Sequence, residues 1–143
     1  MNAAANFFFF LIASAEEEIF SGLAQKLFVT GSEGELEILH GHAPLLTALA
    51  PGPVWVVKED NKEEAFVILG GMLEVQPEVT IILANAAMRA RDIDEAAAMN
   101  AKKTAEDLLG KQHGGKIDYA RAHSELALAL AQLRILRKLR KGG

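Results

Sequence analysis

The sequence changes its pattern near Asn85, and this change most limits the folds that the chain can adopt. Before Asn85, apolar runs of about four to eight residues alternate with Gly, Pro, Asn and Glu, which is typical of strands separated by turns. After it, alanine becomes frequent and apolar residues recur with a period near 3.6, which indicates helices. We therefore expect a β domain in residues 1–86 followed by a helical domain in residues 87–143.

The first part of the chain contains eight candidate strands. They cover residues 7–13, 22–30, 34–39, 45–50, 54–58, 64–69, 72–76 and 79–84. So many short strands in so little sequence predict a flattened antiparallel sandwich or barrel. We expect reversals at residues 59–62, at Gly70 and Gly71, and at Pro77. Pro51 and Pro53 are expected at strand ends or edges, because proline donates no hydrogen bond to a ladder.

The second part predicts two antiparallel helices. Asp92 is expected to cap the first helix, with Glu95 three residues on as in a capping box, and this helix should run from Ile93 to about Leu109 and stop at Gly110. After a turn at residues 114–115, Asp118 should cap a second helix that runs to about Lys141. A connection this short makes the two helices neighbours.

Small and apolar residues give the expected contacts of this hairpin. Close approach of the two backbones is expected at Ala97, Ala101, Ala105, Ala120, Ala127 and Ala131. Leu126, Leu130 and Leu133 form an apolar stripe that another surface should cover.

Several classes of protein are disfavoured by features that the sequence lacks. The uncharged apolar run at residues 7–15 is far shorter than the roughly 20 residues of a membrane-spanning helix, so we expect a soluble protein. We interpret this run as structure and not as a secretion signal, because no Lys or Arg precedes it and three glutamates follow it. The absence of cysteine removes disulfides and thiolate chemistry. No phosphate-binding loop, nucleophile elbow or zinc-protease motif is present, and His40 and His42 alone are too few ligands for a metal site.

The two halves of the chain carry opposite charge. Residues 1–80 have twelve acidic residues and three lysines, a net charge of −9, whereas residues 81–143 have seven acidic and twelve basic residues, a net charge of +5. Opposite fields suggest two faces for different partners. Nucleic acid is a weak candidate, because the acidic half would be repelled and one Trp and one Tyr offer little surface for base stacking.

Several stretches of the sequence resemble the epsilon subunit of bacterial F-type ATP synthases. They are residues 14–16 (SAE), 20–22 (FSG), 29–36 (VTGSEGEL), 41–47 (GHAPLLT), 70–75 (GGMLEV), 92–96 (DIDEA), 117–120 (IDYA), 125–127 (ELA) and 131–134 (AQLR). The resemblance is in order and covers nearly the whole chain. It implies a flattened sandwich of about ten strands followed by a helical hairpin, and a non-catalytic rotor subunit without a cofactor.

The resemblance also implies partners and a location. The partners would be the gamma subunit, the membrane-embedded c-ring, and the alpha and beta subunits of the catalytic head. The sandwich would dock on gamma and the c-ring, while the hairpin could rise along gamma and inhibit ATP hydrolysis. The protein would lie at the cytoplasmic face of the bacterial inner membrane, peripheral and held through the complex.

Some positions depart from the family pattern. The run Phe7–Leu11 replaces the usual alternation of polar and apolar residues in the first strand, and Glu37 and His40 stand where the family often has Gly and Pro. The outward face of the first strand and the loop that would face the c-ring are therefore the places where this chain is expected to differ.

The resemblance implies two sets of contact residues. Glu33, Glu35 and His42 match positions near the polar loops of the c-ring. The basic residues of the second helix would meet acidic segments of the beta subunits when the hairpin is raised, and they are Arg121, Arg134, Arg137, Lys138, Arg140 and Lys141. Cations at a helix C-terminus also interact favourably with the helix dipole, but five in the eight residues from Arg134 to Lys141 exceed that need. Attraction to a membrane surface and simple solvation are the alternatives.

A weak ATP site at Ile93, Asp94 and Arg134 is a further hypothesis. Some family members bind ATP through a motif at the start of the first helix, and here Ala97 replaces the arginine of that motif. This replacement removes the guanidinium group that would pair with phosphate. A second match at residues 117–122 opens the wrong helix. An ATP-sensing module, and a sandwich adaptor unrelated to a rotor, are the alternatives to a rotor subunit.

Overall fold

A computed structural model describes the backbone of residues 6–110 and 116–142, and the side chains of residues 6–110 and 118–138. In this part of the chain the elements are β1 (Phe8–Ala13), β2 (Glu18–Gly31), β3 (Gly34–Leu39), β4 (Leu45–Lys58), β5 (Glu63–Val75), β6 (Val79–Ala84), β7 (Ala87–Arg89), the 3₁₀ helix η2 (Ala90–Asp92), α1 (Glu95–Gly110) and α2 (Lys116–Gly142). The predicted turn at residues 114–115 and His113 lie outside the described residues.

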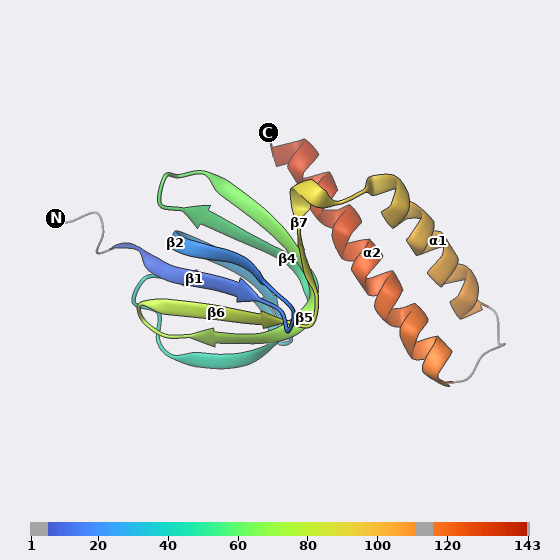
Figure 1. The fold of residues 1–143 in the computed structure, drawn as a ribbon, viewed down its shortest axis with the longest axis horizontal. Helices are drawn as coiled ribbons and strands as arrows, with labels where there is room; N and C mark the ends of the chain where they lie inside the picture. The colour runs from blue at the N-terminus through green and yellow to red at the C-terminus, as the bar shows by residue number, and fades with distance from the viewer. Residues whose placement is uncertain (1–5, 111–115, 143) are drawn as a thin grey trace.

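The strands close into a flattened β-sandwich. Their order is β1-β6-β5-β4-β2-β3, and β1 also pairs with β2, so the strands from β1 to β2 form a ring to which β3 adds an edge. β1 and β6 are parallel and the other pairs are antiparallel. The two helices follow as an antiparallel hairpin beside the sandwich (Figure 1). The predicted fold class is confirmed.

Strands β2, β4 and β5 are longer than predicted, and the predicted reversal at Gly70 and Gly71 is wrong. Both glycines lie inside the 13-residue strand β5, with φ of 95° and 148°. They bend β5 where its partner changes, since Gly71 pairs with Ala84 of β6 and Ile68 pairs with Ala87 of β7. A φ in this range favours glycine because it has no Cβ. By contrast, the predicted turn at Pro77 is confirmed by mutual hydrogen bonds between Gln76 and Val79.

The prediction that Pro51 and Pro53 mark strand ends is also wrong, because both lie inside β4. They pair with Leu69 and Val67 of β5 on one side. On the other side, the register between β4 and β2 breaks between Phe28 and Gly31, which is opposite the prolines. The missing N–H groups are tolerated at this bulge, where the ladder is already interrupted. Two pairs of predicted strands thus merge, one pair into β4 and one into β5, and β7 is an additional strand, so the described residues form seven strands instead of eight or ten.

The core of the sandwich is built by alternate residues of its strands. In β1, Phe8, Phe10 and Ile12 are buried, while Phe9 between them is exposed. The unusual apolar run therefore keeps the period of two that a strand with one buried face requires. Phe20 packs against the rings of Phe10 and Phe66 with centroid distances of 5.8 and 5.6 Å, so aromatic contacts join β1, β2 and β5.

A second, smaller cluster joins the hairpin to the sandwich. Helix α2 lies against β4 and β5, and α1 lies on its far side (Figure 1). The buried members are Ala65, Val67, Ala90, Ala131 and Ile135, with Trp55, Ile93 and Leu128 partly buried around them. The hairpin is therefore folded down on the sandwich through a cluster of eight residues.

The first helix begins two residues later than predicted, and its cap is Asp94 instead of Asp92. The Asp94 carboxylate accepts a hydrogen bond from the Ala97 N–H at 3.1 Å, and α1 starts at Glu95. Asp92 ends the 3₁₀ helix η2, so its position is already used by the preceding turn. The second helix starts at Lys116, which places Asp118 in its first turn.

The alanine contacts of the hairpin are only partly as predicted. Ala105 is buried as expected, but Ala97, Ala101 and Ala120 are exposed. Ala131 is buried too, but against the sandwich, and the other buried alanines of the two helices are Ala98, Ala122 and Ala129. Spacings of seven residues, from 98 to 105 and from 122 to 129, follow the seam of two antiparallel helices. Of the predicted leucine stripe, Leu126 and Leu133 are half-buried and Leu130 is exposed.

Candidate interaction surfaces

The sandwich carries an apolar outer face on strands β1, β2, β4, β5 and β6. The pairings Ala48–Met72, Met72–Leu83 and Leu83–Ala13 place side chains of four strands in one row. A second row joins Phe9 with Val79 and Leu23. We define the outer apolar face by its large members, which are Phe9, Leu11, Leu23, Leu46, Met72, Val79, Ile81 and Leu83.

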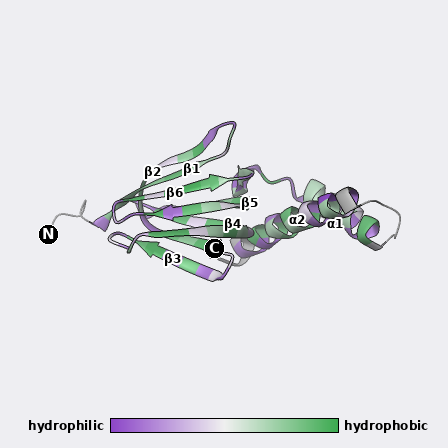
Figure 2. Ribbon diagram, turned by 90° about the horizontal axis from the view of Figure 1, so that it is seen from below, coloured by the Kyte–Doolittle hydropathy of each residue, from purple (hydrophilic) through white to green (hydrophobic). Residues whose placement is uncertain are grey.

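Six of these eight side chains are exposed, which is unusual for large apolar side chains in adjacent rows, and Leu11 and Ile81 are half-buried. Leu46, Leu83 and Met72 are 68%, 59% and 40% exposed. Glu74 lies between Leu46 and Ile81 in register. Figure 2 shows the predominance of hydrophobic colour along the strands. Contiguous exposed apolar surface of this kind marks interaction sites.

The predicted c-ring residues lie at the two ends of β3. Glu33 and Glu35 are exposed at the β2–β3 turn, where Gly31 pairs with Gly34. His42 is half-buried beyond the other end of β3, where its Nδ1 lies 2.7 Å from the Ala43 oxygen. A strand of six residues separates the two ends by about 17 Å. The structure thus keeps the two glutamates together and places His42 apart from them.

The predicted basic residues whose side chains are described all lie at exposed positions of α2. Arg121, Arg134, Arg137 and Lys138 are exposed, while the side chains of Arg140 and Lys141 lie outside the described residues. Arg121 lies near the start of α2, some 13 residues before Arg134, or about 20 Å along the helix. Arg137 borders a groove between α1 and α2, and Lys138 borders a different groove with β2, β3 and β4. The predicted basic set is therefore spread over the length and sides of the helix.

The residues of the hypothetical ATP site have other contacts. Ile93 packs in the cluster between the hairpin and the sandwich, and Asp94 caps α1. Arg134 is exposed on α2. A cap carboxylate at the helix start already satisfies the N–H group that a phosphate would use.

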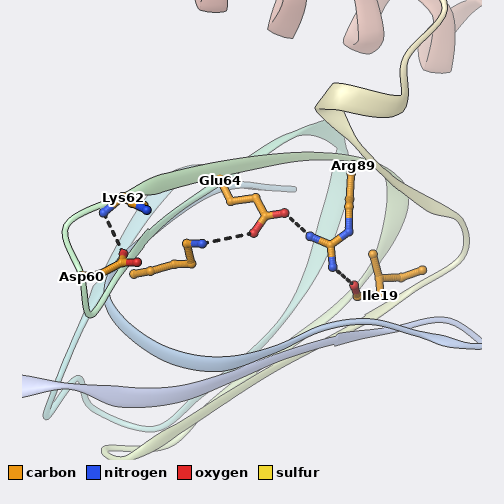
Figure 3. Close-up of polar contacts among 6 residues, drawn as sticks. Ile19, Asp60, Lys62, Glu64 and Arg89 are labelled. Carbon is orange, nitrogen blue, oxygen red and sulfur yellow. Dashed lines mark hydrogen bonds and ion pairs between the residues drawn. The ribbon is translucent and has the colours of Figure 1, made fainter.

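Sequence reasoning missed a polar anchor at the base of the hairpin (Figure 3). Arg89 of β7 pairs with the Glu64 carboxylate of β5 and donates a second hydrogen bond to the Ile19 oxygen of β2 at 2.7 Å. The guanidinium also lies 5.5 Å from the centre of the Phe66 ring. Lys58 approaches the other Glu64 oxygen at 3.8 Å. The anchor joins three strands immediately before η2, and only the charge of Arg89 could have suggested it in the sequence.

No group of three or more metal-ligating residues occurs among the described residues. In the same part of the chain, no helix combines the length and the apolar character that crossing a membrane requires.

Comparison with known proteins gives matches over both parts of the chain. The family described as ATP synthase, Delta/Epsilon chain, beta-sandwich domain matches residues 8–90. The family described as ATP synthase, Delta/Epsilon chain, long alpha-helix domain matches residues 91–137.

Two solved structures are similar in fold. A chain of the Euglena gracilis mitochondrial ATP synthase, solved as OSCP/F1/c-ring in rotational state 1, has a TM-score of 0.81 and 23% identity, over 95% of this chain and 84% of that chain. A chain of the Tetrahymena thermophila mitochondrial ATP synthase central stalk and c-ring has a TM-score of 0.59 and 14% identity, over 90% of this chain and 95% of that chain. At these identities the likeness shows the fold.

Proposed function

The chain belongs to the delta/epsilon family of ATP synthase subunits, and from this we propose that it is a non-catalytic central-stalk subunit of a bacterial F-type enzyme. In this proposal it is the epsilon subunit, which couples the catalytic head to the c-ring and restrains ATP hydrolysis through its hairpin. It would lie at the cytoplasmic face of the inner membrane and be held there by the complex. Residues 1–86 would dock on gamma and the c-ring, and residues 87–143 would regulate ATP hydrolysis.

The outer apolar face is the observation that carries the proposal. Its residues lie outside the cluster that holds α2, since that cluster uses Trp55, Ala65 and Val67 of β4 and β5, whereas the face uses Leu46 of β4 and Met72 of β5. A rotor subunit needs a permanent partner, and permanent interfaces are apolar at their centre. We assign this face to the gamma subunit.

The β2–β3 turn of the sandwich is the part that we propose to contact the c-ring. Glu33 and Glu35 are exposed acids at a tight turn, which can approach a polar partner without loss of buried surface. His42, near the turn at Pro77, would make a separate contact with the ring. Both contacts are proposals from the family resemblance.

The hairpin has the properties of a detachable element. Its contact with the sandwich depends on eight residues, three of which are alanines. Each large apolar member contributes about 1.5–3 kcal/mol before the cost of ordering, so a partner that binds only the raised form can reverse the equilibrium. The basic residues of α2 would then meet the beta subunits of the head, and they are Arg121, Arg134, Arg137, Lys138, Arg140 and Lys141.

Co-purification with the gamma subunit tests the docking role. The wild-type chain is expected to bind gamma at near-equal ratio, and Met72→Glu should reduce binding at least about tenfold, because it buries a charge in the interface. Leu130→Glu is the matched control, since Leu130 is equally exposed at 40% but lies on α2. Equal loss with both variants, or none with Met72→Glu, would contradict the assignment.

The ATP-sensing alternative is tested by calorimetry on the isolated chain. Ala97 replaces the phosphate-binding arginine and the Asp94 carboxylate occupies the start of α1, so we expect no saturable heat with millimolar ATP. Saturable heat that is lost in Arg134→Ala would favour the sensor. A chain that binds neither ATP nor gamma would be a sandwich adaptor unrelated to a rotor.

A further inference from the structure

The face of the sandwich beside α2 changes from apolar to acidic toward its edge. Glu37 of β3 pairs with Phe28 of β2, and Phe28 pairs with Trp55 of β4. Paired residues lie on the same face of a sheet, so these three side chains form a row. Glu35 precedes Glu37 by two residues and lies on the same face of β3. The edge strand thus presents two carboxylates beside two aromatic rings.

The end of α2 reaches over this face. Ile135 is fully buried in the cluster to which Trp55 belongs. Lys138 lies three residues later, on the same side of the helix. It borders a groove of about 330 Å³ that is also lined by Glu35, Glu37, Phe28 and Trp55. One cation of α2 and two carboxylates of β3 therefore share one groove.

We propose that the edge strand β3 is a docking surface for the basic end of α2, and that this attraction helps to hold the hairpin down. The two ion pairs among the described residues both involve Glu64, so Lys138 acts across the groove and not through a contact pair. Attraction between exposed charges is modest and is screened by salt over about 10 Å at 0.1 M. The opposite net charges of the two parts of the chain act in the same direction.

We call this attraction between Lys138 and the β3 carboxylates Glu35 and Glu37 the latch. It gives Glu35 a second role. Its carboxylate is also proposed to face the c-ring, so a cationic loop of that ring would compete with Lys138 for it. This consequence rests on the proposed function, whereas the latch itself is a property of the isolated chain.

The absence of cysteine allows a clean test of the latch. A pair of spin labels at Lys62→Cys and Ala120→Cys, both exposed positions, would report the ratio of docked to undocked hairpin by the distance between them. We expect Lys138→Glu to lower this ratio about two- to fivefold at 0.05 M salt, and the effect to shrink at 0.5 M salt.

Two further variants decide whether the groove is responsible. Arg134→Glu makes the same change of charge at an exposed position one turn earlier, and Arg134 does not line the groove. We expect Arg134→Glu to change the ratio of docked to undocked hairpin by less than half as much as Lys138→Glu does. Combining Lys138→Glu with Glu37→Lys should restore the ratio toward that of the wild type.

An equal effect of Arg134→Glu, or a double variant no better than the single ones, would overturn the proposal. Neither outcome depends on gamma or the c-ring, so failure of the latch is distinct from failure of the rotor assignment.

Discussion

Arg89 and Glu64 form an ion pair that fastens the last strand before the hairpin to β5. The same guanidinium donates to the Ile19 oxygen, so one side chain joins β7, β5 and β2 (Figure 3). The chain is therefore held to the sandwich as far as residue 89. The pivot of any hairpin movement lies beyond it, in η2 and the residues before α1.

Replacing Arg89 should loosen this pivot and destabilise the sandwich. Arg89→Met is expected to lower the free energy of unfolding by about 2 kcal/mol, because it removes the donor of the Ile19 carbonyl and leaves the Glu64 carboxylate with only the longer contact to Lys58. Denaturant unfolding measures the change. Arg91→Met, at an exposed position of η2, is the control and should stay within about 0.5 kcal/mol of the wild type.

Replacing Thr80 should stabilise the protein. Its side chain is fully buried, and its hydroxyl has no hydrogen-bond partner within the described part of the chain. Thr80→Val keeps the shape and removes the unpaired hydroxyl, so we expect a gain of about 1 kcal/mol and a higher Tm in calorimetry. Thr47→Val is the control, because its hydroxyl donates to Ala48. A loss of stability in Thr80→Val would mean that the hydroxyl has a partner in solution.

A side chain at position 71 should be poorly tolerated. A Cβ on Gly71 would lie 2.2 Å from the Leu83 oxygen, and the φ of 148° favours glycine. Gly71→Ala is expected to cost at least about 3 kcal/mol, since the obstacle is the backbone of β6, which cannot move freely. Gly110→Ala meets nothing within 4 Å and should be neutral or slightly stabilising. Similar midpoints of urea unfolding for the two variants would refute this reading.

Removing the hairpin tests its regulatory role. A chain that ends after Ala90 is expected to assemble with gamma as the full chain does, because the outer apolar face is untouched. ATP hydrolysis by the reconstituted complex should rise at least about fivefold, which corresponds to a coupling free energy of about 1 kcal/mol. Unchanged hydrolysis in a fully assembled complex would exclude inhibition by the hairpin.

The fold class was predictable because the pattern of apolar residues is set by burial. Phe8, Phe10 and Ile12 alternate with exposed or half-buried residues even within a run that looks uniformly apolar, and the change of pattern near Asn85 comes just before the last strand, β7, after which the helices begin. These signals are local. They do not reveal that Gly70 and Gly71 bend a continuous strand, because a bend and a reversal use the same residue type.

The candidate sites were less predictable, because they depend on neighbours far apart in the sequence. Arg89 meets Ile19 across 70 positions and Glu64 across 25. Nothing near Lys138 in the sequence indicates that it shares a groove with Glu35 and Glu37. The cap moved from Asp92 to Asp94 because η2 takes up the preceding turn, which two aspartates so close together could not distinguish.

The parallel pairing of β1 with β6 has a consequence for synthesis. During synthesis β1 leaves the ribosome before β6, and it finds this neighbour only when residues 79–84 have emerged, some 70 residues later. Such a distant pairing is slow to form, so the nascent chain must keep Phe8 and Phe10 from aggregation until then. The helices are made after the strands and meet a partner whose strands are already complete, so the sandwich can begin to fold before the hairpin docks on it.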